Sequence, residues 1–116
     1  EASGLFIVGT LADIIGAATQ RTQIITDAGP ADVFVNSGIV LVNQDTGAAI
    51  TLNMPLSSDK VGPVLISDFK GDAGANNIPI VLSGDDEFPG GLTSWTIDGD
   101  AGSVFLRPIA GVGYTL

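Results

Sequence analysis

We predict that this chain folds as an all-β domain: a compact antiparallel β-sandwich or barrel of about eight short strands, with a short N-terminal arm or helix. Its 116 residues suffice for one domain with a buried core, because 45% are hydrophobic and only 15% are charged. From residue 21 onward, apolar or β-branched runs alternate with turn residues at a spacing of about 8–12 residues. Strands do not alternate with helical segments, and no internal repeat typical of a solenoid is visible.

The first 20 residues differ in composition from the rest and are predicted to form an N-terminal arm for attachment or subunit contact. Thr10 is placed to cap a short helix that would run from about residue 11 to residue 19. A helix of this length is marginal in isolation, so its apolar side must pack against another surface. The candidate contact residues of this arm are Leu5, Phe6, Ile7, Val8, Leu11, Ile14 and Ile15.

Residues 21–116 form the predicted β domain, in which turn residues separate the strands. Asn43–Gly47 predicts a hairpin that joins 39–42 to 49–52, and Asp98-Gly99 predicts a two-residue turn with Gly99 at positive φ. Pro79 indicates an edge position or an irregular start for its strand. The predicted strands are 22–26, 33–35, 39–42, 49–52, 64–66, 78–82, 93–97, 104–106 and 113–116.

Two predicted strands, Ile39–Val42 and Val64–Ile66, are apolar at consecutive rather than alternating positions. A continuously apolar strand is typically buried on both faces. A two-layer domain of this size gives each sheet one buried face and one wet face, so the second face needs a neighbour. We expect a homo-oligomer to supply it. The alternative is a central strand covered by the N-terminal segment of the same chain.

The composition excludes several classes of partner and chemistry. Four Lys and Arg against 13 Asp and Glu give a net charge of −9, which argues against nucleic acid and anionic lipid as partners. The absence of Cys and His removes disulfides, thiol catalysis, the usual zinc sites and His-based acid–base chemistry. No apolar run is long enough to span a membrane. Because the chain begins at Glu1 rather than Met, we expect a processed product or an excised fragment.

Polar clusters of the sequence do not predict a catalytic or metal site. A hydroxyl–lysine dyad needs a desolvated Lys, but Lys60 lies beside Ser57 and Ser58 in a predicted polar turn. Several carboxylates invite a calcium interpretation, yet Gly102 stands where the helix–loop–helix pattern needs a ligand. We therefore predict solvated turns, no metal, no cofactor and no enzymatic activity. The carboxylates are those of Asp85, Asp86, Glu87, Asp98 and Asp100.

Trp95 and Tyr114 are the only Trp and Tyr of the chain. Two such rings are more often core residues, although they are also the candidates for stacking on a sugar ring. A glycosidase would need an aromatic-lined cleft around paired carboxylates, which so few aromatic residues do not predict.

Three segments resemble a widespread all-β module of phage virion proteins. They are GAAITLNMP at 47–55, VLISDFKGDAGANNIPIVLSG at 64–84 and WTIDGDAGSVFLRPIAGVGYTL at 95–116. The chain departs from the module at its end, where Gly111-Val112-Gly113-Tyr114 replaces the usual closing Gly-x-x-Trp. The residues that carry the resemblance are Asp68, Gly71, Ala75, Asn76, Asn77, Ile78, Ile80, Ile97, Asp98, Gly99, Gly102, Ser103 and Val104.

Members of this module are short all-β domains of tail fibres, tail spikes and head appendages, and they are typically trimeric. The resemblance therefore implies a homotrimeric virion structural protein on the particle surface, with capsid or tail proteins as partners and a host surface glycan as a further candidate. The short chain with its apolar N-terminus favours a capsid decoration protein over a tail fibre module. Residues 1–20 lie outside the module and are expected to hold the shell.

Two other functions compete with this interpretation. In a secreted filament built by strand exchange, Leu5–Val8 would insert into the sheet edge of a neighbour. In a carbohydrate-binding module, Trp95 and Tyr114 would contact the sugar.

Overall fold

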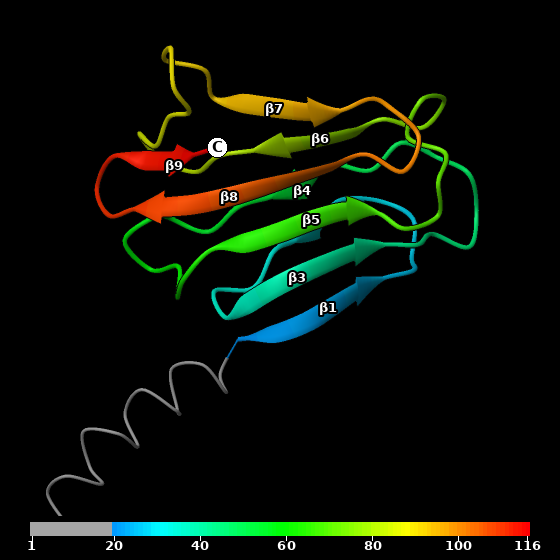
Figure 1. Ribbon diagram of the computed structural model, residues 1–116, viewed down its shortest axis with the longest axis horizontal. Helices are drawn as coiled ribbons and strands as arrows, with labels where there is room; N and C mark the ends of the chain where they lie inside the picture. Colours follow the sequence, from blue (N-terminus) through cyan, green and yellow to red (C-terminus); the bar gives the residue numbers. More distant parts are fainter. Residues whose placement is uncertain (1–19) are drawn as a thin grey trace, which may run out of the picture.

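The computed structural model describes residues 20–116, and this part of the chain contains β-strands but no helix (Figure 1). The predicted all-β class is confirmed. The arm residues Leu5, Phe6, Ile7, Val8, Leu11, Ile14 and Ile15 lie outside the described residues. The strands are β1 (Arg21–Ile25), β2 (Ala31–Asp32), β3 (Ser37–Val42), β4 (Leu52–Asn53), β5 (Val64–Asp68), β6 (Ile78–Val81), β7 (Ser94–Ile97), β8 (Ser103–Ile109) and β9 (Gly113–Thr115).

The strands form two mixed sheets, which we call sheet A and sheet B. Sheet A has the order β1-β3-β5-β8-β9, and sheet B has the order β2-β4-β6-β7. The first three strands of each sheet are parallel to one another, and β7, β8 and β9 are added antiparallel. The prediction of antiparallel sheets is therefore wrong for the greater part of the fold.

The chain winds between the sheets, so that β1, β3 and β5 lie in sheet A while β2, β4 and β6 lie in sheet B. Each connection from β1 to β6 crosses from one sheet to the other, so each strand from β3 to β6 pairs with the strand two earlier in the sequence. This coiled path is the solenoid-like arrangement that the sequence argued against. The repeat is hidden because paired positions recur at unequal intervals, as in the series Thr22, Ile39 and Leu65.

Both predicted hairpins are replaced by connections between sheets. Residues 43–51 join β3 in sheet A to β4 in sheet B, and residues 98–102 join β7 in sheet B to β8 in sheet A. Gly99 does not have a positive φ; in this turn it is Ala101 that does, at 58°. The Gly102 N–H donates to the Gly99 carbonyl at 2.9 Å and closes the turn. The sequence signal for a turn was correct, but the hairpin was not.

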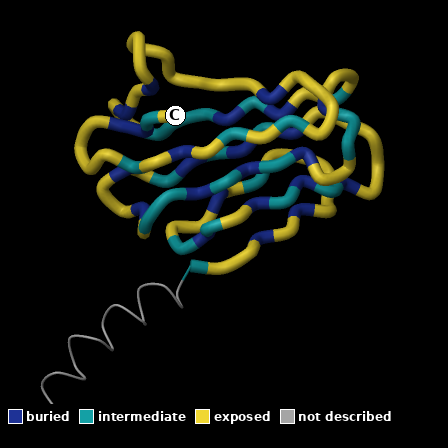
Figure 2. The backbone as a smooth tube through the Cα atoms, viewed as in Figure 1, coloured by how far each residue is buried: buried dark blue, intermediate teal, exposed yellow. Residues whose placement is uncertain are grey.

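Along most strands buried residues alternate with more exposed ones, and the buried residues form one core between the sheets (Figure 2). Sheet A supplies Val40, Ile66 and Leu106, which are all completely buried. Sheet B supplies Leu52 and Ile80, which are buried to the same degree. Because a large apolar side chain stabilises the fold by roughly 1.5–3 kcal/mol when buried, this shared core holds the two layers together.

A buried carboxylate at the end of β5 organises the loops that carry much of the module resemblance. Asp68 is 2% exposed, and its Oδ2 accepts from the N–H groups of Ala73 at 2.8 Å and Ala101 at 3.0 Å. Its Oδ1 accepts from the Gly71 N–H at 3.0 Å. Asp68 thus ties the loop after β5 to the turn before β8, which is a structural role for this motif residue.

Candidate interaction surface

The outer face of sheet A carries a row of outward side chains across four neighbouring strands, and on three of these strands the side chain is apolar. Register pairs Thr22 of β1 with Ile39 of β3, Ile39 with Leu65 of β5, and Leu65 with Phe105 of β8. The next outward row runs from Ile24 through Leu41 to Ser67 and Ser103. We call the large apolar members of these rows the apolar face; they are Ile24, Ile39, Leu41, Leu65 and Phe105.

Several side chains of the apolar face are well exposed in the single chain. Ile24 is 60% exposed, Phe105 46% and Ile39 40%, whereas Leu41 and Leu65 are half-buried between their neighbours. Isolated exposed apolar residues are ordinary, but a contiguous apolar patch on a sheet marks a site of contact. The consecutive apolar residues of β3 and β5 predicted this second face.

The apolar face is also free of negative charge. Among the outward positions of β1 from Thr22 onward, β3, β5 and β8, no Asp or Glu occurs, and Arg107 carries the one formal charge. The guanidinium of Arg21 lies just before this face, with its central carbon 5.0 Å from the centroid of the Phe34 ring. In a chain with a net charge of −9, this composition differs sharply from the average surface.

The outer face of sheet B is polar by comparison. Its best-defined outward row consists of Asp32, Asn53, Val81 and Ser94 from four neighbouring strands. The Asn53 side-chain amide donates to the Asp32 carboxylate at 3.4 Å, so these two groups interact along the surface. This face is suited to contact with water rather than to burial.

Lys60 directly follows a turn at residues 57–59, where the sequence predicted a polar turn, but its side chain is not solvated, because the residue is only 7% exposed. Its ammonium donates to three backbone carbonyls: Ser37 at 2.7 Å, Gly62 at 2.9 Å and Val61 at 3.1 Å. Burial lowers the pKa of Lys60 to about 8. Lys60 is therefore a buried cation that fastens the start of β3 to the loop before β5.

The candidate hydroxyl partner of Lys60 has a different role. Ser57 donates to Asp86 from its N–H at 2.7 Å and from its Oγ at 2.8 Å, and both residues are buried. The Ser57 Oγ also accepts from the Gly111 N–H at 3.2 Å. These bonds hold three loops together, and Ser57 does not form a dyad with Lys60.

Two of the five carboxylates considered for calcium are engaged in separate hydrogen bonds. Asp86 is engaged with Ser57, and the Asp100 Oδ1 accepts from the Gly74 N–H at 2.8 Å. Within residues 20–116, no three acidic side chains gather in a way that would hold a metal ion. Nor does this range contain a helical segment with the length and apolarity needed to span a bilayer.

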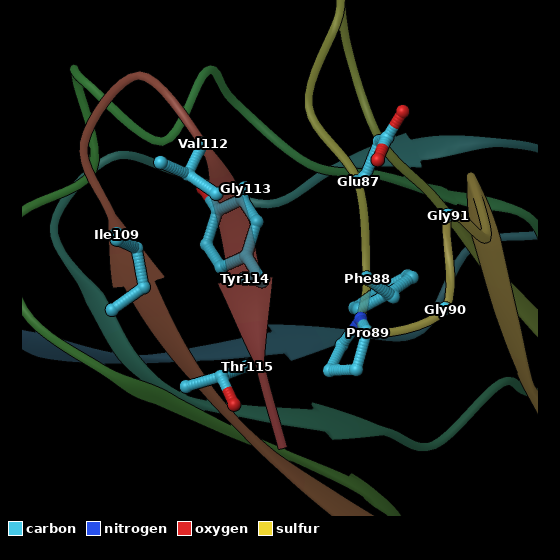
Figure 3. A pocket seen from close by; sticks show the side chains of 10 residues that line it. All are labelled: Glu87, Phe88, Pro89, Gly90, Gly91, Ile109, Val112, Gly113, Tyr114 and Thr115. Atoms are coloured by element: carbon cyan, nitrogen blue, oxygen red, sulfur yellow. The ribbon is translucent and has the colours of Figure 1, made fainter.

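A cavity of about 280 Å³ lies beside β9, between that strand and the 87–91 loop. Figure 3 shows Ile109, Val112 and Tyr114 on one side of it and Phe88 and Pro89 on the other. The loop is held to the chain around β9 because Glu87 donates to the Val112 carbonyl and accepts from the Tyr114 N–H, at 3.1 and 3.0 Å. A Cβ at Gly113 would collide with the backbone of Glu87, so this close approach requires glycine.

The two aromatic residues proposed for ligand stacking lie in different environments. Tyr114 is 2% exposed, and its hydroxyl donates to the Pro55 carbonyl at 2.8 Å. Burial raises the pKa of Tyr114, with further contributions from the negative charges of Asp86 and Asp59. Trp95 is 37% exposed and meets Phe88 edge to face, with ring centroids 6.3 Å apart. Trp95 does not line the cavity beside β9, and sugar stacking stays a prediction for both.

No known protein family matches the sequence, and no curated protein matches it.

Proposed function

We propose that this chain is a non-enzymatic structural protein of a bacteriophage particle, displayed on the virion surface as a homotrimer that decorates the capsid. The observation that carries this proposal is the apolar face of sheet A. It is a contiguous, carboxylate-free surface on an otherwise strongly acidic domain. Such a surface favours an assembling protein, because its burial between subunits removes apolar area from water.

The resemblance to the phage module supports the choice of particle. Its motif residues have structural partners here: Asp68 accepts three backbone N–H groups, and Asn76 donates to Asp72 at 2.8 Å. A motif that fixes loops accounts for a shared sequence pattern without shared catalysis.

The buried polar groups support a non-enzymatic role. Lys60 is engaged by three carbonyls, and Asp86 by the N–H and hydroxyl of Ser57. A general acid, base or nucleophile would need an atom directed at a substrate. In the described part of the chain, these two candidates instead direct their polar atoms at the protein itself.

Sedimentation equilibrium of the full chain tests the assembly. We expect a species of three times the 11.7 kDa chain mass, and a monomer at micromolar concentration would overturn the proposal.

Imaging of particles labelled with gold-conjugated antibody against this chain tests the location. Label distributed over the capsid is the expected result. Label on the tail alone would replace decoration by a tail fibre module, and particles without label would overturn the virion assignment. Long filaments formed by the purified chain would favour strand exchange instead.

Deletion of residues 1–19 of the predicted 1–20 arm tests it as the attachment segment; Gln20 is kept because its side-chain amide donates to the Val61 and Pro63 carbonyls of the β domain. The truncated chain should remain a folded trimer and should lose binding to particles stripped of this protein. Truncated protein that still binds would place attachment on the β domain.

A further inference from the structure

We propose that the apolar face is the surface through which copies of this chain meet, and that in the trimer the three apolar faces pack together around the three-fold axis. This inference rests on the proposed trimer and names the contact that holds it together. The face consists of Ile24, Ile39, Leu41, Leu65 and Phe105 on four neighbouring strands of sheet A.

Charge identifies a second copy as the occupant of this face. Two copies that each carry −9 repel one another wherever their acidic loops approach. The outward positions of sheet A carry no carboxylate, so this is where two copies come together with the least repulsion. A basic partner, in contrast, would be drawn to the acidic loops. It would not be drawn to the outer face of sheet A, where the charged outward residue is the positive Arg107.

The shape of the face also fits a contact between copies. The five residues of the face lie on four hydrogen-bonded strands, which at about 4.8 Å between strands makes a surface roughly 14 Å wide. The middle of the row is formed by Ile39 and Leu65, on the two inner strands β3 and β5. Three such faces turned toward one axis close on themselves, so a trimer leaves no copy of the face in water.

The outer face of sheet B supplies a matched control. Val81 lies on β6, an inner strand of sheet B, just as Ile39 lies on β3, an inner strand of sheet A. Both residues are β-branched and point away from the core, but Val81 is flanked in its row by Asn53 and Ser94. A charge at Val81 therefore enters a polar surface, whereas a charge at Ile39 enters the proposed contact.

The first test compares Ile39→Asp with Val81→Asp in the full chain by sedimentation, after circular dichroism has established that both variants fold. Ile39→Asp should raise the concentration for half-dissociation of the trimer at least about 30-fold, and Val81→Asp should leave it unchanged. If the wild-type chain is trimeric and folded Ile39→Asp remains equally trimeric, the inference is overturned while the proposed trimer stands. If the wild-type chain is monomeric, the proposed function fails first.

The second test remains decisive if Ile39→Asp does not fold. The chain has no Cys, so a single introduced thiol reports its own contacts alone. Upon mild oxidation Ile39→Cys should link two of the three chains of each trimer into a disulfide dimer and leave the third unlinked, while Val81→Cys should give no link. Complete linkage of all chains in pairs would indicate a two-fold dimer. If Ile39→Cys forms no link, the inference is also overturned. This is the result expected if residues 1–19 of the same chain cover the face.

Discussion

The outer faces of the two sheets differ, although the inner faces of both contribute to one core. Outward residues of sheet A include Ile24, Ile39 and Phe105, each at least 40% exposed. The outward row of sheet B contains Asp32 and Ser94, which suit contact with water. A single domain needs only the inner face of each sheet to fold, so the fold by itself does not account for the apolar residues on the outside of sheet A.

This difference shows why consecutive apolar residues in a strand carry more information than alternating ones. In β7 the apolar residues Trp95 and Ile97 alternate with the polar residues Ser94 and Thr96. In β3 the outward positions are filled by Ile39 and by Leu41. The fold is stabilised by the buried half of this pattern, and the outward half is available for assembly.

The largest effect on stability is expected in β5, where the adjacent residues Leu65 and Ile66 point to opposite faces of sheet A. Ile66 is completely buried, so Ile66→Ala should lower the free energy of unfolding by about 2–5 kcal/mol at every protein concentration. Leu65 belongs to the apolar face, and Leu65→Ala should lower the unfolding midpoint mainly at concentrations where the chain is assembled. Denaturant unfolding over a dilution series measures both. An equal loss in the dilute samples would mean that Leu65 is part of the monomer core.

A smaller loss is expected at the end of the same strand. Asp68→Asn places an amide NH₂ group where Oδ1 or Oδ2 now accepts backbone N–H groups, and should cost about 1–3 kcal/mol of unfolding free energy. The matched control is Asp98→Asn, at an exposed position in the neighbouring turn, with an expected change within about 0.5 kcal/mol. Assembly should be unchanged in both, because Asp68 points inward. A weakened trimer in folded Asp68→Asn would show that the loops as well as the apolar face contact a neighbour.

The sequence predicted the all-β class because turn residues and apolar runs are local signals. Strand pairing was not predictable in this way. Ile39–Val42 and Ala49–Leu52 fit a hairpin, yet β3 and β4 lie in different sheets, and Val40 pairs with Ile66 instead. Parallel partners lie far apart in the chain, and the unequal lengths of the connections hide their recurrence.

The candidate surface was predictable in part. Ile39, Leu41 and Leu65 stand out because they interrupt the expected alternation. Ile24 and Phe105 join them only through the strand register, which the sequence does not contain. Similarly, Asp68 was recognised as a motif residue, but its role required the folded loops that bring Ala73 and Ala101 to its carboxylate.

The buried ammonium of Lys60 should make stability, but not assembly, depend on pH. Unfolded Lys60 keeps its proton up to a pKa of 10.5, whereas burial lowers the pKa in the folded chain to about 8. Between these values the unfolded state binds more protons, so stability should rise as the pH is raised from 8 toward 10. The three carbonyl acceptors offset part of the burial penalty, and we expect a gain on the order of 1 kcal/mol.

Unfolding free energies at pH 8, 9 and 10, compared with those of Lys60→Met, isolate this contribution. The range stops at pH 10 because of Tyr114, whose pKa is raised by burial in the folded chain. Above pH 10 this residue would ionise more readily in the unfolded chain, so stability would then fall as the pH rises. A rise of the same size in Lys60→Met would assign it to other groups. If the dissociation of the trimer changed over the same pH range, Lys60 would lie in the contact between subunits and not only within its own chain.

The smallest effect is expected in the turn that carries the chain from sheet B to sheet A. A Cβ added at Gly99 would meet no atom within 4 Å, and this residue lacks a positive φ, so Gly99→Ala should change the unfolding free energy by less than about 0.5 kcal/mol. Ala101 holds the left-handed conformation at φ 58°, which glycine adopts without strain. Ala101→Gly should therefore stabilise the chain by up to about 1 kcal/mol. Thermal unfolding of the two variants checks both expectations. If Gly99→Ala lowers the unfolding free energy by more than about 1 kcal/mol and Ala101→Gly does not raise it, the two-residue hairpin predicted from the sequence alone would be supported instead.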